Sequence, residues 1–205
     1  AGTPPALPCQ GSTMTAPLDI FLVAPPGLEP ILAEEAAELG FAPARPVPGG
    51  VEVAGGWTEV WRANLELRGA ARVLVRLAAF RALHVAQLDK RARKVDWGAT
   101  LRPDVPVRVE ATCRKSRIYH DGAAESRIAR AIREELGAPI AEGRVDGAVV
   151  VKARIEDDLC TISIDTTGEA LHRRGHKQAV GKAPLRENLA GLVLRAAGYR
   201  GEEPV

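Results

Sequence analysis

Apolar and amphipathic segments alternate along the first third of the chain. The apolar run Leu18–Ala24 ends at Pro25 and Pro26, which predicts a buried strand with a sharp stop. Apolar residues then recur at helical spacing from Leu28 to Leu39, with glutamates between them and Gly40 after them. This segment predicts an amphipathic helix.

The following segments complete a β-α-β-β-α-β order. The proline-spaced segment Phe41–Val47 predicts an edge strand, and Val51–Val53 predicts a short strand that Gly55 closes. A second helix is predicted by the residues that we place on one core-facing side, namely Trp57, Val60, Trp61, Asn64 and Leu65. Alternation along Ala71–Phe80 predicts a strand with its core side at Val73, Val75, Leu77 and Ala79. The order is that of a ferredoxin-like unit.

The second half predicts another small α/β unit. It opens with a basic, helix-like stretch over Val85–Trp97, followed by the alternating strand Val105–Cys113 and a helix over Gly122–Leu136. Two strands, Ala148–Ile155 and Leu159–Thr166, are joined by an acidic turn. The predicted fold class is therefore α/β (α+β), with two units in tandem and a mixed or antiparallel sheet in the second.

The two ends of the chain lack the periodic pattern of the two α/β units, apart from one final helix. Residues 1–16 are small, polar and rich in proline, and we expect residues 1–13 to be a vector remnant before a disordered start. After residue 170 the chain is rich in charge and glycine, and a final helix is predicted from Pro184 to Ala196. Since nothing downstream could bury this helix, we expect a third domain to have been cut away.

Composition excludes several classes of protein. The chain has 205 residues, of which 46% are hydrophobic and 26% charged, as in an ordinary globular protein. Its uncharged apolar runs are too short to span a bilayer, so we expect no membrane association. Three cysteines without CxxC spacing argue against a disulfide framework and for a reducing, cytoplasmic location.

The net charge of +2 conceals a division between the two halves. Residues 1–83 hold six arginines against eight acidic residues, a net charge of −2. Residues 84–205 hold 22 basic and 18 acidic residues, a net charge of +4, together with all four histidines. This asymmetry favours an anion-binding second half.

Familiar catalytic motifs are missing from the sequence. There is no GxGxxG, Walker or GxSxG pattern. His172 and His176 have the spacing of a metal pair but lack ligand partners nearby, so we predict no metal site. Cys113 and Cys160 fall on the inward sides of their strands, where packing is a better interpretation than catalysis.

Three basic clusters are the remaining candidates for chemistry. The first is Lys90, Arg91, Arg93 and Lys94 on the basic helix; the second, between a strand and a helix N-terminus, is Arg114, Lys115, Arg117, Tyr119 and His120; the third is Arg173, Arg174 and Lys177. Each alone also fits a solvated charged face. Together they favour a polyanion whose backbone phosphates they contact, with little sequence readout.

The aromatic residues bear on how such a polyanion would bind. The chain has only eight, and we place Trp57, Trp61, Phe21, Phe41 and Phe80 in the core of the first unit. Tyr119 alone lies in a basic loop. A sheet platform that stacks bases on paired aromatics is therefore disfavoured, and recognition of phosphate and shape is favoured.

Several longer segments resemble a known family. They are FLVAPPGLEPILAEEAAELGF, VEVAGG, CRKSRIYHDGAAESRIARAI and RIEDDLCTISIDTTGEALHRRGHKQAVGKAPLRENLA. Over residues 17–205 the sequence resembles the N-terminal region of THUMP-containing RNA guanine-N2 methyltransferases, which modify ribosomal RNA or tRNA. Some of these carry the older description of N6-adenine-specific DNA methylases. His176 departs from the family, which more often has Tyr there.

The resemblance implies a domain order and a division of labour. It implies a ferredoxin-like domain over residues 17–82, a THUMP domain with a mixed sheet over residues 83–170, and a linker with the first helix of a truncated methyltransferase domain over residues 171–205. The S-adenosylmethionine loop and the catalytic motif would follow Val205. We therefore expect a monomeric, inactive RNA-binding portion without a cofactor, from a parent transferase that uses S-adenosylmethionine.

The expected partner is structured rRNA or tRNA, contacted at a stem or an end. Arg127 and Arg130 join the candidate contacts by helical period, although pairing with Glu134 on a solvated face explains them equally well. Two other interpretations stay open. One is a THUMP module of a different RNA-modifying enzyme, for tRNA thiolation or deamination, and the other is a protein-interaction domain.

Overall fold

The computed structural model describes residues 17–175 and 181–201. In chain order the strands are β1 (Leu18–Val23), β2 (Arg45–Val47), β3 (Gly50–Gly55), β4 (Arg72–Arg81), β5 (Val107–Arg114), β6 (Val149–Glu156) and β7 (Leu159–Asp165). The helices are α1 (Glu29–Glu38), α2 (Trp57–Glu66), α3 (Val85–Ala92), α4 (Asp121–Leu136) and α5 (Glu187–Ala196), with 3₁₀ turns η1 (Trp97–Ala99) and η2 (Leu171–Arg173).

Within the described residues all strands join in one sheet, in the order β2-β3-β1-β4-β7-β6-β5. Every pairing is antiparallel except β5 with β6. The mixed α/β fold with a mixed sheet is confirmed. What the periodicity did not predict is the seam between β4 and β7, which makes the two halves one continuous sheet.

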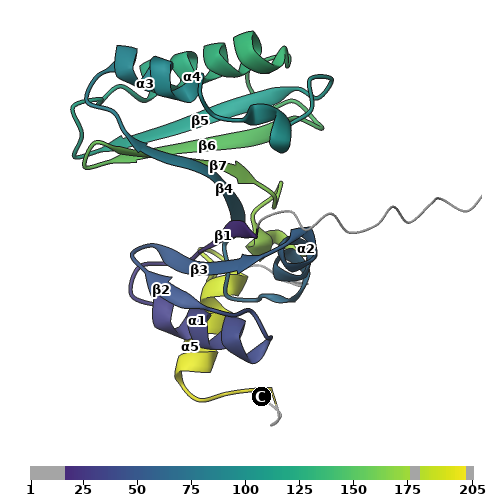
Figure 1. Cartoon of the computed structure of the whole chain (residues 1–205). Coiled ribbons are helices and arrows are strands. Elements are labelled where there is room, and N and C mark those ends of the chain that lie inside the picture. Colours follow the sequence, from purple (N-terminus) through teal and green to yellow (C-terminus); the bar gives the residue numbers. More distant parts are fainter. Residues whose placement is uncertain (1–16, 176–180, 202–205) are drawn as a thin grey trace, which may run out of the picture.

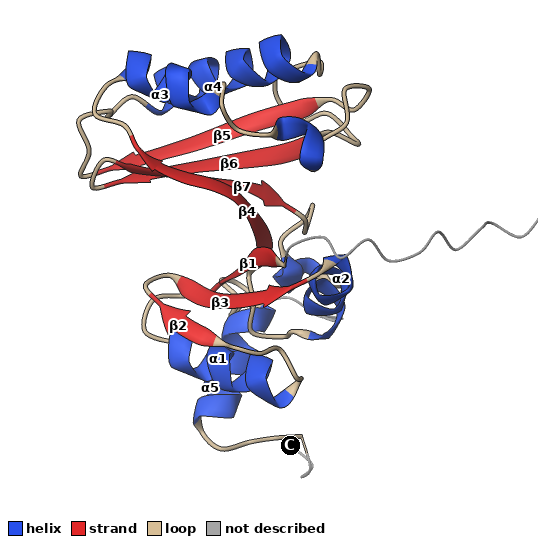
Figure 2. Ribbon diagram, in the orientation of Figure 1, coloured by secondary structure: helices blue, strands red, loops and turns tan. Residues whose placement is uncertain are grey.

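The sheet carries two separate hydrophobic cores on the same face. One joins β1, β3 and β4 to α1 and α2, and the other joins β5, β6 and β7 to α3 and α4. Figures 1 and 2 show the sheet bent so that these helices lie outside, while its helix-free faces look toward each other across the bend. The helix-free face is therefore the inner surface of a curved molecule.

A bulge in β4 lets this strand serve both cores. Its register against β7 shifts between Arg76 and Ala78. Before the shift Val73 and Val75 point into the first core, and after it Phe80 packs against the second. Our placement of Phe80 in the core of the first unit was therefore wrong. The predicted alternation through Ala79 was wrong, because the extra residue reverses the faces and leaves Ala79 exposed.

Predicted boundaries shift at two places. The edge strand expected over Phe41–Val47 is reduced to β2, since Ala42–Ala44 lie outside the ladder with β3. The last helix begins at Glu187 rather than Pro184, with Arg186 as its N-cap residue.

Helix α5 packs on the first core. Leu192 is fully buried there, and Asn188 is buried with its amide nitrogen 3.5 Å from the carbonyl oxygen of Gly69. Gly69 leaves the room this contact needs, since a Cβ on it would lie 2.4 Å from Leu192 Cδ2. The loop itself is held by the buried Glu35, whose carboxylate accepts hydrogen bonds from the amides of Arg68 and Gly69. The described helix therefore has a partner within this chain.

Helix α4 protects the free edge of β5. Its side chains Asp121 and Glu125 accept hydrogen bonds from the amides of Cys113 and Ala111, at 2.7 and 2.9 Å. These amides would otherwise offer a template for another strand. No helix in the described part of the chain has both the length and the hydropathy needed to cross a bilayer.

Candidate nucleic-acid interface

The loop between β5 and α4 is held in place by one carboxylate from the β6–β7 turn. Asp158 Oδ1 accepts hydrogen bonds from Ser116 Oγ and from the amide of Arg117, both at 2.9 Å. These bonds, the Arg117 amide first, lower the pKa of Asp158. Ile118 is buried in the second hydrophobic core and anchors the loop there. Because Asp158 is used internally, the basic side chains of the loop are left facing outward.

The outward side of this loop is cationic and carries one aromatic ring. Lys115 is exposed at φ +45°, and the Arg117 side chain is 70% exposed, 3.8 Å from Asp158. Tyr119 is 74% exposed, with its ring centroid 4.3 Å from that of His120. His120 is the N-cap residue of α4. The structure therefore places cations beside a helix N-terminus, which favours anions.

Arginines also occur near the ends of β4, β5 and β6, on the side of the sheet where this loop begins. The register places Arg114 beside Glu156 at the ends of β5 and β6, and β4 ends with Arg81 opposite Leu159. Arg154 binds Glu156 at 2.5 Å, and this contact lowers the pKa of Glu156. Sequence patterns do not single out Arg81, because only strand pairing brings it to the β6–β7 turn, where its Nη1 lies 3.5 Å from the carbonyl oxygen of Asp157.

The cluster on α3 divides into exposed and occupied residues. Lys90, Arg91 and Lys94 are exposed along one side of the helix, where with His84 they line a hollow of about 570 Å³. Arg93 instead contacts Asp89, Glu134 and Glu135, and Glu134, followed by Asp89, raises the pKa of Arg93.

On α4 the two candidate arginines differ in the same way. Arg130 binds Glu134 at 2.7 Å, within the network that holds α3 to α4. Arg127 is exposed and has no ion pair within the described residues. Six residues further along, Arg133 is exposed as well, although it was not among the candidates named from the sequence.

The third cluster is divided by the structure. Arg174 donates to three carbonyl oxygens at the C-terminal end of α2, those of Asn64, Leu65 and Leu67, at 2.6–2.9 Å. Arg173 is exposed and lies 3.9 Å from Glu169. Lys177 and His176 lie outside the described residues. The guanidinium groups of Arg174 and Arg93 are thus occupied by the protein itself.

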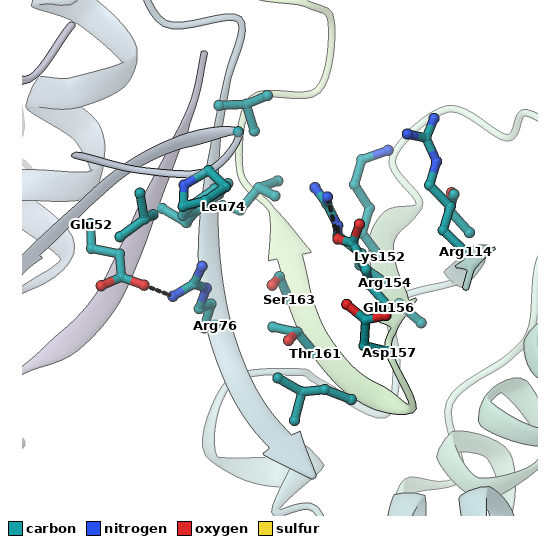
Figure 3. Close-up of a pocket in the computed structure, with 18 of the residues that line it drawn as sticks. Glu52, Leu74, Arg76, Arg114, Lys152, Arg154, Glu156, Asp157, Thr161 and Ser163 are labelled. Carbon is teal, nitrogen blue, oxygen red and sulfur yellow. Dashed lines mark hydrogen bonds and ion pairs between the residues drawn. The ribbon is translucent and has the colours of Figure 1, made fainter. Parts of the chain in front are cut away.

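The helix-free face of the sheet forms a hollow of about 790 Å³ (Figure 3). Two of its ion pairs join different strands, Arg76 with Glu52 and Lys152 with Glu110, and a third, Arg154 with Glu156, lies within β6; the N–O distance is 2.5 Å in each. Arg76 also lies over the ring of Phe21, 4.3 Å from its centroid. Since most cations here have acidic partners, this face has less capacity for polyanions than the loop edge.

The two described cysteines have little thiolate character. Burial, followed by Asp121, raises the pKa of Cys113 to about 11, and burial raises that of Cys160 to about 12. Neither thiol is therefore poised as a nucleophile at neutral pH. No group of three His, Cys, Asp or Glu side chains suited to a metal ion occurs within the described residues.

Comparison with known proteins gives a family for one domain. Residues 19–74 match the RlmL ferredoxin-like domain. The ribosomal RNA large subunit methyltransferases K/L of Methylococcus capsulatus and Syntrophotalea carbinolica are 32% and 33% identical to this chain, over 88% and 91% of its length. The chain covers only 25% and 27% of those proteins. It spans about half, 48%, of a Synechocystis relative that is named as a candidate RNA methyltransferase and is 32% identical over 87% of this chain.

Solved structures share the fold across both cores. A Listeria monocytogenes protein described as a predicted N6-adenine-specific DNA methylase is 27% identical, with a TM-score of 0.81 over 92% of this chain and 50% of that one. TrmN from Thermus thermophilus is 25% identical, with a TM-score of 0.72 over 88% of this chain and 55% of that one. The chain thus contains an RlmL ferredoxin-like domain and is homologous, over most of its length, to part of proteins named as RNA methyltransferases.

Proposed function

We propose that this chain is the RNA-binding portion of an S-adenosylmethionine-dependent methyltransferase that acts on guanine N2 in rRNA or tRNA. In this proposal residues 17–82 are the ferredoxin-like domain, residues 83–170 are a THUMP domain, and residues 171–205 lead toward the catalytic part. Methyl transfer and the cofactor belong to the part of the relatives that this chain does not match. The homology to RNA methyltransferases supports the proposal.

The observation that carries the proposal is the arrangement of charge at the β5–α4 loop. Asp158 is used to shape the loop, and Asp121 is used to cap the edge of β5. The exposed cations of the loop therefore outnumber the exposed carboxylates beside them. The proposed RNA contacts at this edge are Arg81, Arg114, Lys115, Arg117, Tyr119 and His120, and those on the adjoining helices are Lys90, Arg91, Lys94 and Arg127.

The test is RNA binding measured against salt. Contacts to about four phosphates predict a slope of log K against log salt near −3, or roughly 100-fold weaker binding at 200 mM than at 50 mM salt. Fluorescence anisotropy with a labelled rRNA hairpin and with tRNA measures this slope. A weak signal that does not change with salt for either RNA would refute the proposal.

A further inference from the structure

The outer side of α2 carries an apolar stripe. Trp57, Trp61 and Leu65, spaced four residues apart, are 42%, 67% and 77% exposed. The core side of the same helix is formed instead by Val60 and Ala63, which are fully buried, as is Leu67 directly after the helix. Our placement of Trp57, Trp61 and Leu65 on the core side was therefore wrong. Among the described residues, both of these large aromatic side chains are partly exposed and accessible to a ligand.

The stripe ends beside a group of cations. The carbonyl oxygen of Leu65 accepts a hydrogen bond from Arg174 at 2.9 Å, which fixes the segment around η2 against the end of α2. Figure 1 shows this segment, in yellow-green, next to α2. Arg173 lies in η2, and α5, whose N-cap residue is Arg186, packs against η2. Burial, then the positive charges of Arg186 and Arg173, lower the pKa of His172 in η2, and the negative charge of Glu187 opposes this. Both arginines are exposed.

Three of the acidic side chains around the stripe are already engaged, whereas Glu187, beside Arg186, has no ion pair within the described residues. Glu59 accepts a hydrogen bond from the amide of Gly56 at 2.7 Å, and Glu66 binds Arg62 at 2.9 Å. Glu169 binds Arg144 at 2.7 Å. The stripe therefore combines two exposed indole rings with neighbouring positive charge that local carboxylates only partly offset. Exposed aromatic rings beside cations are the combination with which proteins bind single-stranded nucleic acids.

We propose that α2 is a stacking platform for unpaired RNA bases, with Trp57 and Trp61 under the bases and Arg173 and Arg186 near the phosphates. The proposal rests on the proposed function and adds a second RNA site, distinct from the β5–α4 loop. That loop suits a structured stem, which it would contact through phosphates alone. The stripe instead offers aromatic rings on which bases can stack, and the bases of a paired helix are already stacked on one another. A strand with free bases is therefore the occupant whose chemistry fits both the rings and the charge.

The test compares an unstructured 12-nucleotide RNA with a closed hairpin. The double variant W57A/W61A should bind the unstructured RNA at least tenfold more weakly, since one stacked base contributes about tenfold in affinity. Hairpin binding and the urea midpoint should stay near those of the unchanged protein, because both rings are exposed. V145A removes an exposed apolar side chain elsewhere (44% exposed) and serves as the matched control.

Tryptophan fluorescence gives an independent readout. Trp97 is 2% exposed, so quenching by the unstructured RNA should come from Trp57 and Trp61 and disappear in the double variant. Unchanged affinity of that variant for the unstructured RNA overturns the platform. The platform is also overturned if the double variant differs from the unchanged protein only in self-association, measured by sedimentation. The stripe would then be a protein–protein contact. If hairpin binding stays salt-dependent in either case, the proposed function stands; if neither RNA binds, both proposals fall.

Discussion

Arg72 and Asp165 form an ion pair across the seam where the two halves of the sheet meet. Arg72 Nη1 on β4 lies 2.6 Å from Asp165 Oδ2 on β7, and the Asp165 side chain is only 1% exposed. Lys152 lies 3.8 Å from the same oxygen, and the amide of Thr167 donates to the other at 3.1 Å. A buried carboxylate at this position depends on its cationic partner.

We expect Arg72→Met to lower the free energy of unfolding by about 2–3 kcal/mol, since it leaves a buried carboxylate short of its nearest cation. Urea denaturation measures the change. Glu156→Gln breaks the exposed pair with Arg154 and serves as the control, with an expected loss below about 1 kcal/mol. Equal losses in the two variants would contradict a special role for the seam.

Local periodicity predicted the order of the elements but not how they share a sheet. The alternation of Val73 and Val75 identifies the core side of β4 correctly. It fails beyond Arg76 because the bulge there is stabilised by pairing with β7, more than 80 residues later in the chain. The seam and the common face of the two cores therefore follow from tertiary contacts that a local pattern does not contain.

The candidate site was predictable to a similar extent. The basic loop with Lys115 and Arg117 is visible in the sequence, but its anchor Asp158 resembles an ordinary hairpin turn. For α2 the hydrophobicity of tryptophan suggested burial. The small residue Ala63 faces the core instead, because a short helix packs closely on the sheet where its side chains are small.

The contact between α5 and the loop before β4 can be tested at one glycine. We expect Gly69→Ala to destabilise the protein by about 1–3 kcal/mol, because the new Cβ overlaps Leu192. Hydrogen exchange of the α5 amides should accelerate along with this loss. Gly191→Ala, inside α5 where the nearest atom to a new Cβ lies at 3.8 Å, should instead stabilise the helix by about 0.5–1 kcal/mol. A neutral result at Gly69 would show that α5 does not dock there.

The segment after β7 should depend on Arg174. Because its guanidinium satisfies three carbonyl oxygens of α2, Arg174→Ala should cost about 1–3 kcal/mol of stability. Arg174→Lys should recover only part of this, since an ammonium group cannot reproduce the planar fork. The exposed Arg173→Ala, one residue earlier, should change the thermal midpoint little. Comparable losses of stability at Arg173 and Arg174 would argue that the hydrogen bonds of Arg174 to α2 do not hold this segment in place.

The shape of the β5–α4 loop should depend on the charge of Asp158. Its pKa in the folded protein lies below the ordinary value of 3.8, so its contribution is complete above that value and is lost as the pH falls through the folded pKa. The Arg117 amide resonance should therefore titrate with a midpoint below 3.8. In Asp158→Asn this titration should disappear, whereas Asp157→Asn should keep it. A titration midpoint above 3.8 would show that the Asp158 carboxylate is not stabilised by these hydrogen bonds.

Reversing charge at the exposed loop should separate RNA binding from stability. We expect Lys115→Glu with Arg117→Glu to weaken hairpin binding by more than tenfold and to reduce the magnitude of the salt slope by about 2, one for each lost phosphate contact. The thermal midpoint should change little, because both side chains are exposed and Arg117 only approaches Asp158 at 3.8 Å. Arg102→Glu is the control for one charge reversal, to be compared with Lys115→Glu and Arg117→Glu taken singly, since Arg102 is an exposed arginine that pairs with Asp104 in another loop. Anisotropy titrations at several salt concentrations measure all of these quantities. If the control loses as much affinity as the single loop variants, the binding is a response to net charge and the loop has no special role in it.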